Sequence, residues 1–239
     1  MKNNPNELKY YGLHACLAIW KKRPDDIVRL YLDPAHLKRC KPLLQWCAQN
    51  KRAYHLVEPL ELEKVSESVH HEGICLLARK PMPASPPNAA TSGCLIYLDG
   101  VQNPHNLGAI LRSAAHFGTL GIMGEKKILP ALSPSCCRIA QGGAEEVPLL
   151  ALDRPLAWLK EKRYALIATS SHKGEPLYNF RFPPRSALIL GSESEGISKP
   201  LLASADHLIR IPGTGSVESL NVSVATALCL SEYYRQNPS

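Results

Sequence analysis

The chain has 239 residues, of which 45% are hydrophobic and 21% charged, so it suits one large domain or two ordinary ones and is neither disordered nor fibrous. Its longest strictly apolar runs have about five residues, against the roughly 20 that a membrane helix requires, and the N-terminus has no apolar segment of the secretory type. The formal net charge is +7, and the first 93 residues hold 14 basic and 9 acidic side chains, which indicates either a polyanionic partner or an ordinary charged surface.

The 8 cysteines show no Cys-x-x-Cys pair of the kind that binds zinc. Cys136 and Cys137 are adjacent, which is a poor geometry for a shared metal ion. Without a secretory signal, we expect reduced and mostly buried thiols, no metal site and a cytoplasmic protein.

A stretch rich in proline and small polar residues occupies residues 81–93. Because proline removes a backbone donor and fixes φ, such a stretch forms neither a helix nor a central strand and predicts a semi-rigid linker. We therefore predict one domain over residues 1–80 and a second over residues 94–239.

The predicted first domain alternates helical and strand patterns. Helices are expected at 10–22, 35–49 and 59–66, and strands at 27–32, 54–57 and 73–78. This alternation predicts a small α/β sandwich. The basic side chains that we consider for phosphate binding, or simply as surface charge, are Lys21, Lys22, Arg23, Lys38, Arg39, Lys41, Lys51 and Arg52.

The predicted second domain has short apolar strands separated by helices. Strands are expected at 94–98, 120–123, 165–169, 187–190 and 207–211, and helices at 107–117, 155–163, 198–204 and 219–235. This pattern predicts a mainly parallel sheet with helices on both faces. Ligands of such sheets bind beyond the carboxyl ends of the strands, so the turns that follow the strands are the places to look for a site.

The first notable turn follows residues 94–98 and reads Asn103-x-x-Asn106-x-Gly108-x-x-x-Arg112. Asn103 or Asn106 can cap the next helix, and Gly108 permits a close approach of another backbone or a ligand. Arg112 lies in a helix rich in small residues, where it is either functional or an ordinary surface charge.

The second turn reads Leu190-Gly191-x-Glu193-x-x-Gly196 and follows a buried strand. Two glycines permit a tight turn whose backbone groups are free to bind a small molecule. Glu193 offers an acceptor to a ligand or to a neighbouring loop. The alternative is a structural turn with exposed carboxylates.

The third turn runs from Ile211-Pro212 to Ser219-Leu220-Asn221-Val222-Ser223. Its Gly213-Thr214-Gly215 segment resembles a phosphate-binding loop, but Glu218 stands where a dinucleotide fingerprint has its third glycine, and a carboxylate there repels a pyrophosphate. Ser219 and Asn221 place a hydroxyl and an amide at the start of the final helix, where Ser219 is alternatively only a cap.

Together, the three turns resemble motifs 1, 2 and 3 of the SpoU/TrmH-type RNA ribose 2′-O-methyltransferases of the SPOUT superfamily. Order and spacing match over essentially all of residues 94–236. Residues 1–80 look like the L30e-like substrate-binding domain that is often fused to this catalytic domain. The resemblance implies an α/β catalytic domain with a mainly parallel sheet and a deep trefoil knot, which sequence-level rules would not suggest.

The resemblance also implies an S-adenosyl-L-methionine cofactor, bound near Gly191, Ile211 and Leu220 and, with a looser correspondence, near Thr169 and Ser170. Arg112 matches the family's catalytic arginine. The other matched active-site positions are Asn106, Glu193, Ser219 and Asn221. One departure is Gly213, where the family often has a bulkier residue, so that this loop is expected to be more flexible.

We therefore expect methylation of a ribose 2′-hydroxyl in structured RNA, either rRNA or tRNA, by a homodimer formed through the second domain, with no membrane or DNA partner. An alternative is a non-catalytic RNA-binding or ribosome-associated protein built on the same domains. A dinucleotide-dependent oxidoreductase is a third reading, and the absence of a complete Gly-x-Gly-x-x-Gly motif weighs against it.

Overall fold

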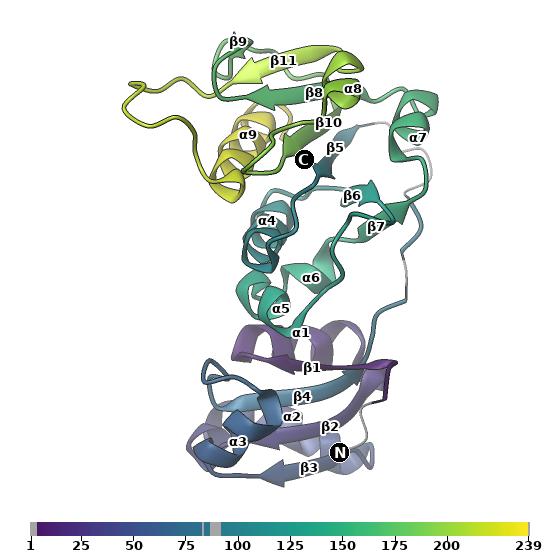
Figure 1. Cartoon of the computed structure of the whole chain (residues 1–239). Helices are drawn as coiled ribbons and strands as arrows, with labels where there is room; N and C mark the ends of the chain where they lie inside the picture. The colour runs from purple at the N-terminus through teal and green to yellow at the C-terminus, as the bar shows by residue number, and fades with distance from the viewer. Residues whose placement is uncertain (1–3, 83, 87–91, 239) are drawn as a thin grey trace. The chain divides into compact units, whose positions relative to one another are not determined.

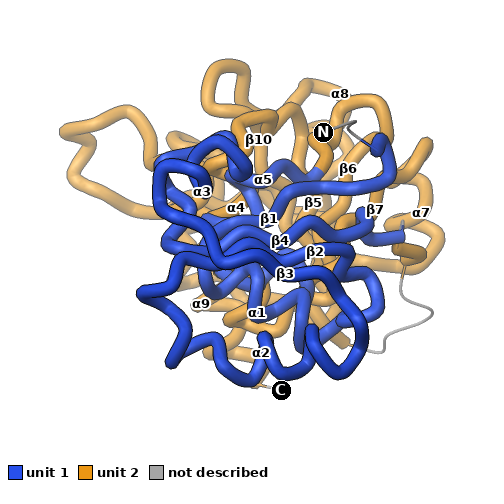
Figure 2. Tube along the Cα trace, turned by 90° about the horizontal axis from the view of Figure 1, so that it is seen from below, with its two compact units in different colours: residues 1–82, 132–146 blue, residues 83–131, 147–239 orange. Residues whose placement is uncertain are grey.

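A computed structural model describes residues 4–82, 84–86 and 92–238. The chain forms two compact units, which are taken separately here (Figure 2). Unit 1 contains Met1–Met82 and Leu132–Glu146, and unit 2 contains Pro83–Ala131 and Val147–Ser239. The predicted linker at 81–93 falls partly outside the described residues, because 83 and 87–91 are not among them.

Unit 1 is built on a four-stranded sheet in the order β1-β4-β2-β3 (Figure 1). β1 and β2 pair antiparallel with β4, whereas β3 pairs parallel with β2 and lies at the edge. The strands are β1 (Glu7–Tyr11), β2 (Ile27–Leu32), β3 (Ala53–Leu56) and β4 (Ile74–Arg79). The helices of its first segment are α1 (Leu13–Lys22), η1 (Pro24–Asp26), η2 (Pro34–His36), α2 (Leu37–Gln49) and α3 (Pro59–Ser66).

The predicted helix at 10–22 was wrong at its start, because Tyr10 and Tyr11 belong to β1 and pair with Leu76 and Cys75 of β4. Gly12 then has a φ of +88°, a left-handed conformation that ends the strand and precedes α1. The predicted helix at 59–66 matches α3.

Unit 1 is completed by α5 (Pro134–Ala140) and α6 (Gly143–Glu146), although our prediction assigned residues 94–239 to the second domain. Cys137 of α5 is buried in the same apolar cluster as Tyr10, Cys16 and Ile19. The side chains of Arg23 and Glu145 also form an ion pair at 2.7 Å. These contacts explain why residues 132–146 pack with the first 82 residues.

Unit 2 is built on a seven-stranded sheet in the order β7-β6-β5-β10-β8-β11-β9, and every pairing is parallel. This confirms the predicted parallel α/β architecture. The strands are β5 (Gly93–Asp99), β6 (Gly121–Glu125), β7 (Leu149–Leu152), β8 (Ala165–Ser170), β9 (Glu175–Pro176), β10 (Arg185–Gly191) and β11 (His207–Arg210). The sequence analysis did not predict β7 or β9, and β9 has only two residues.

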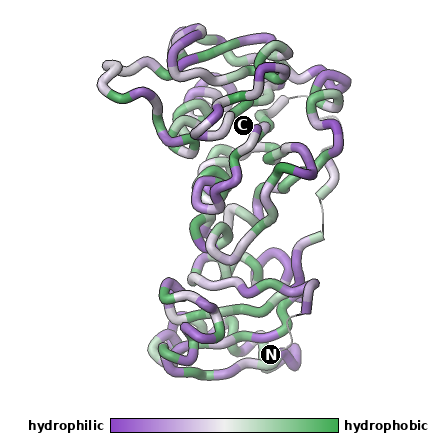
Figure 3. Tube along the Cα trace, viewed as in Figure 1, coloured by the Kyte–Doolittle hydropathy of each residue, from purple (hydrophilic) through white to green (hydrophobic). Residues whose placement is uncertain are grey.

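Helices cover both faces of this sheet, and its strands are largely hydrophobic (Figure 3). Leu95 and Ile189 share one apolar cluster with Leu159 and Leu201, which places α7 (Pro155–Glu161) and α8 (Lys199–Ala203) on one face. α4 (Pro104–His116) and α9 (Val222–Gln236) pack against each other on the other side of the sheet (Figure 1).

All 8 cysteines are free and buried, as predicted. Burial raises the pKa of the Cys75, Cys94 and Cys229 thiols to about 12, so these thiols stay protonated at neutral pH. Among the described residues, no group of His, Cys, Asp or Glu side chains has the arrangement of a metal site. A search of the same residues finds no helix with the length and apolar character needed to traverse a bilayer.

Candidate functional site

The candidate site lies at one edge of the sheet of unit 2, where the three predicted turns meet. β5, β10, β8 and β11 are consecutive parallel neighbours, so their carboxyl ends share that edge. The first turn follows β5, the second follows β10 and the third follows β11. Open parallel sheets bind ligands at this edge.

Three side chains, one from each turn, form a closed hydrogen-bonded cluster. The Nδ2 atom of Asn106 donates to Oε1 of Glu193 at 2.9 Å. The Nδ2 atom of Asn221 donates to the same Oε1 at 2.7 Å and to Oδ1 of Asn106 at 3.0 Å. Glu193 was expected to accept a hydrogen bond from a ligand or a neighbouring loop, and here it accepts one from Asn106 of the first turn. We refer to these residues as the asparagine–glutamate cluster.

Helix capping explains how the two asparagines are oriented. Asn103, and not Asn106, caps α4 by accepting a hydrogen bond from the His105 amide at 2.9 Å. Asn106 lies one turn later, is 8% exposed, and is free to bond with Glu193. Asn221 caps α9, where its Oδ1 accepts from the Ser223 amide at 2.8 Å and from the Ser223 hydroxyl at 2.6 Å. Its Nδ2 is therefore directed to the cluster.

The second turn is closed tightly on Gly191. A Cβ atom on Gly191 would lie 2.1 Å from the carbonyl carbon of Gly196, so only glycine fits without moving the backbone. The Gly196 amide donates to the Ser192 carbonyl at 3.0 Å, and Gly196 has a φ of +70°. This geometry holds Glu193, which lies inside the turn, in a fixed position.

Asp99, at the end of β5, connects the first and second turns. Its Oδ2 atom accepts a hydrogen bond from the Ser198 amide at 2.7 Å. Sequence reasoning missed Asp99 and Ser223. The available signal for Asp99 was a carboxylate directly after an apolar strand, and for Ser223 a hydroxyl two residues after a capping asparagine.

The residues predicted near the cofactor come from neighbouring strands, but their side chains are not all brought together. Thr169 and Ser170 end β8, and Ile211 follows β11. The Thr169 hydroxyl donates to the Ile189 carbonyl of β10 at 3.1 Å, and the Ser170 hydroxyl accepts from the Lys173 amide at 3.1 Å. Gly191 and Ser170 therefore end adjacent strands, because β10 pairs with β8.

The loop between β11 and α9, seen at the left of Figure 1, carries Ser219 and Leu220. Both residues are exposed, Leu220 to 45%, and the side chain of Ser219 makes no hydrogen bond with the described part of the chain. Arg112 of α4 is also exposed and forms no hydrogen bond or ion pair with the residues that the structure describes. Arg112, Ser219 and Leu220 therefore lie outside the asparagine–glutamate cluster.

All three turns lie within one known protein family. The model of the SpoU rRNA Methylase family matches residues 93–231, which is more than half of the chain. The chain belongs to this family. A second model, described as RNA 2′-O ribose methyltransferase substrate binding, matches residues 10–84 of this SpoU-family protein.

The SpoU-family protein is similar to relatives along almost its whole length. It is 37% identical to an uncharacterized tRNA/rRNA methyltransferase, YfiF, of Escherichia coli O157:H7, over 99% of this chain and 70% of the relative. It is 33% identical to the 23S rRNA (guanosine-2′-O-)-methyltransferase RlmB of Bordetella pertussis, over 94% of this chain and 96% of that protein. A crystal structure of an RNA 2′-O ribose methyltransferase superposes with a TM-score of 0.82 at 26% identity, covering 97% of this chain and 89% of the other.

Proposed function

We propose that this protein transfers a methyl group from S-adenosyl-L-methionine to a ribose 2′-hydroxyl in structured RNA, with ribosomal RNA as the first substrate to test. The observation that carries the proposal is the asparagine–glutamate cluster, which joins the three family motifs at the carboxyl edge of the sheet. Membership of a family of rRNA methylases and similarity to 23S rRNA 2′-O-methyltransferases support the same reaction.

We propose that backbone groups of Gly191, Ile211 and Leu220 hold the cofactor, with Thr169 and Ser170 nearby. At position 191 the backbone of Gly196 fills the space that a side chain would need, so this part of the turn consists of backbone alone, which supports binding through peptide groups. When bound, S-adenosylmethionine supplies an electrophilic methyl group. A Cβ atom on Gly213 would meet nothing within 4 Å. With glycine at this position, the loop has no side chain there that could cover the proposed cofactor site.

The chain's own residues have to position the ribose hydroxyl and remove its proton. We propose that Arg112 stabilises the negative charge that develops on the 2′-oxygen, since a guanidinium stays protonated and is a poor base unless its neighbours change its state. Asn106 and Asn221 orient the reacting groups, and Glu193 holds both amides. Ser219 contributes a hydroxyl after the exposed loop closes on substrate.

Unit 1 is proposed to bind the RNA, in line with the family model over residues 10–84. Three of the basic candidates are already engaged within the unit. Lys22 pairs with Glu146 at 2.7 Å, Arg23 pairs with Glu145 at 2.7 Å, and Nη2 of Arg52 donates to the Asp25 carbonyl at 3.2 Å. The remaining exposed candidates, which are better placed to meet phosphates, are Lys21, Lys38, Arg39, Lys41 and Lys51.

Two finer features remain proposals: an L30e-like fold for unit 1 and a deep trefoil knot in unit 2. The strand order supports the knot, because β10 lies between β5 and β8 although it follows β8 in the chain.

We also propose a cytoplasmic homodimer. Val222 and Leu230 of α9 are buried within unit 2, which leaves Val224 and Tyr234, exposed to 48% and 40%, as apolar candidates for the interface. Sedimentation at micromolar concentration tests the dimer.

The proposed reaction is tested by incubating the full chain with tritiated S-adenosylmethionine and protein-free 23S rRNA. Labelled positions are then mapped as sites resistant to alkaline cleavage. We expect label in RNA that is lost with Glu193→Ala. RNA binding without cofactor binding in a calorimetric titration would instead favour the non-catalytic alternative.

A further inference from the structure

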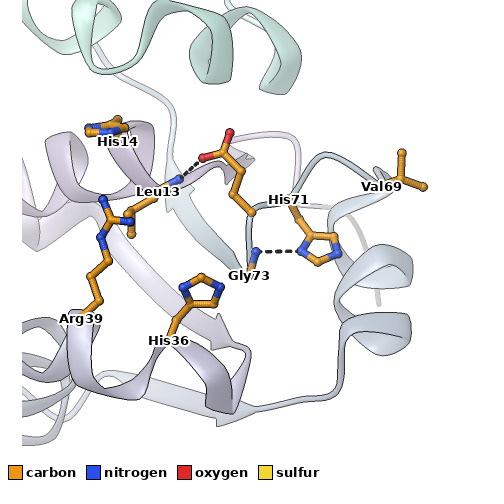
Figure 4. A pocket seen from close by; sticks show the side chains of 8 residues that line it. Leu13, His14, His36, Arg39, Val69, His71 and Gly73 are labelled. Carbon is orange, nitrogen blue, oxygen red and sulfur yellow. Dashed lines mark hydrogen bonds between the residues drawn. The ribbon is translucent and has the colours of Figure 1, made fainter.

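A pocket of about 430 Å³ lies within unit 1, far in sequence from the three family motifs. It is formed by the start of α1, by the η2–α2 segment and by the residues that precede β4 (Figure 4). Its lining consists of Leu13, His14, His36, Arg39, Val69, His71, Glu72 and Gly73. We call it the histidine pocket. A volume of this size suits a small molecule or one nucleotide.

One wall of the histidine pocket is fixed by the backbone of Gly73. Gly73 has a φ of +74°, and a Cβ atom there would lie 2.1 Å from Cδ2 of His36. The His36 ring therefore occupies the space that any other side chain at position 73 would fill. The Gly73 amide also donates to Nδ1 of His71 at 3.0 Å, and His71 is only 8% exposed. This wall of the pocket is therefore formed by the Gly73 backbone with the His36 ring directly beside it.

The charges around the pocket favour an anion. Its single carboxylate, Glu72, is already engaged, because Oε2 accepts from the Leu13 amide at 3.1 Å and Oε1 faces Nη1 of Arg138 at 3.9 Å. Arg39 is exposed and has no hydrogen-bond or ion-pair partner in the part of the chain described here. In Figure 4 its guanidinium extends toward Leu13 and His14. The unpaired cation of the pocket is therefore available to a phosphate.

The remaining lining is suited to a nucleobase. Leu13 is a largely buried apolar lining residue and Val69 is an exposed one, and imidazole rings stack on unpaired bases in RNA-binding proteins. We propose that the histidine pocket binds an unpaired nucleotide of the RNA substrate, with its phosphate on Arg39 and its base against His36. This inference rests on the proposed function only in taking RNA as the ligand.

Arg39→Gln and Lys64→Gln form a matched pair of variants that tests this proposal. Both residues are exposed on helices of unit 1 and both changes remove one positive charge, but only Arg39 lines the pocket. The probe is a fluorescein-labelled RNA hairpin with a single-stranded loop, titrated against the full chain by anisotropy. We expect about tenfold weaker binding for Arg39→Gln, because a charged hydrogen bond is lost, and less than a twofold change for Lys64→Gln.

The role of the ring is tested by His36→Phe and His36→Ala, with melting curves to confirm folding. We expect the phenylalanine variant to keep most of the affinity and the alanine variant to lose it, because stacking needs a ring. The same stem closed into a fully paired duplex should not distinguish any of these variants from the unchanged protein. Equal affinities of Arg39→Gln and Lys64→Gln for the loop RNA would overturn the proposal.

Crosslinking locates the contact directly. A hairpin carrying 4-thiouridine in its loop should crosslink, on irradiation, to peptides containing residues 13–14, 36–39 or 69–73. Crosslinks confined to other peptides would exclude the pocket. Methyl transfer is measured separately, so a protein that binds RNA through the pocket but methylates none refutes the proposed reaction and leaves the pocket standing.

Discussion

Glu193 and Asn221 lie 28 residues apart in sequence, yet the Glu193 carboxylate accepts a hydrogen bond from the Asn221 side chain at 2.7 Å. Because Asn221 also caps α9, this contact ties the turn after β10 to the start of the last helix. Any loss of the carboxylate removes a shared acceptor from both Asn221 and Asn106.

Glu193→Ala is expected to lower the single-turnover rate of RNA methylation by about 100-fold, a typical loss when a preorganised polar group in an active site is removed. The control is Glu195→Ala, on the same turn, whose side chain makes no hydrogen bond or ion pair with other described residues. Its rate should stay within about twofold of the unchanged protein. Equal rates for the two variants would contradict the role given to the cluster.

Arg112→Lys keeps the positive charge but loses the planar guanidinium with its several donors. We expect the methylation rate to fall by roughly 100-fold, equivalent to about 3 kcal/mol, while the affinity for S-adenosylmethionine stays nearly constant. Because Arg112 is exposed and has no hydrogen-bond or ion-pair partner in the described part of the chain, the free energy of unfolding should change by less than about 0.5 kcal/mol. A near-normal rate, or a lost cofactor site in a folded protein, removes Arg112 from this role.

Gly191→Ala forces a methyl group to within 2.1 Å of the Gly196 backbone, whereas Gly213→Ala meets nothing within 4 Å. We expect the first change to cost about 1–3 kcal/mol of stability and to weaken S-adenosylmethionine binding at least tenfold. The second should leave both quantities almost unchanged. Calorimetric titration and urea unfolding of the two variants provide the comparison, and similar cofactor affinities would mean that the turn is not part of the cofactor site.

Removal of residues 1–82 tests how far unit 2 is independent. The cluster and the proposed cofactor residues all belong to unit 2, so we expect the truncated protein to bind S-adenosylmethionine but to bind RNA more weakly and with less salt dependence. In the truncated protein, residues 132–146 no longer have the first 82 residues, against which Cys137 and Glu145 are buried. We therefore expect proteases to cut first within residues 132–146. A folded truncated protein without cofactor binding would refute this division.

A carboxylate in the last helix, α9, predicts how the stability of the fold depends on pH. Hydrogen bonds from Arg235, at 2.7 Å and 2.8 Å, lower the pKa of Glu232 to about 2 despite the burial of that carboxylate. The ordinary pKa of glutamate is about 4.3, so the ionised side chain stabilises the fold above that pH, and this contribution disappears as the pH falls toward 2.

Glu232→Gln should therefore destabilise the protein at pH 7, and the difference from the unchanged protein should shrink between about pH 4 and pH 2. Urea unfolding at pH 7, 5 and 3 measures this difference. Glu161→Gln serves as the control, because Glu161 is exposed and, among the residues that the structure describes, pairs only with the adjacent Lys162. A difference that is independent of pH would show that the carboxylate charge is not involved.

The sequence predicted much of unit 2 because its central strands are short continuous apolar runs and its site residues directly follow them. Asn106, Glu193 and Asn221 were expected only as active-site positions of the family, and the structure brings their side chains into hydrogen-bond contact, while their role in catalysis stays a prediction. Arg112 and Ser219 could not be placed in this way, since both are exposed and neither side chain has a hydrogen bond or ion pair among the described residues.

The sequence predicted unit 1 less well, because some of its elements are determined by contacts between residues that lie far apart in the chain. β1 pairs with a strand that lies about 70 residues later, Glu7 opposite Arg79, and only Gly12 separates its Tyr10 and Tyr11 from the apolar residues of α1. α5 and α6 are too short to show a clear periodicity. Their place in unit 1 depends on burial of Cys137 beside Tyr10, which local sequence patterns do not reveal.

Residues 132–146 lie inside the range of the methylase family model and yet complete the core of unit 1. During synthesis, the first 82 residues therefore leave the ribosome before their last packing partner exists. Unit 1 can reach its final core only after residue 146 has emerged, by which time β5, α4 and β6 of unit 2 have also been made. Cotranslational folding of this protein is consequently interleaved, and the substrate-binding unit cannot mature ahead of the methylase unit as a separate N-terminal domain would.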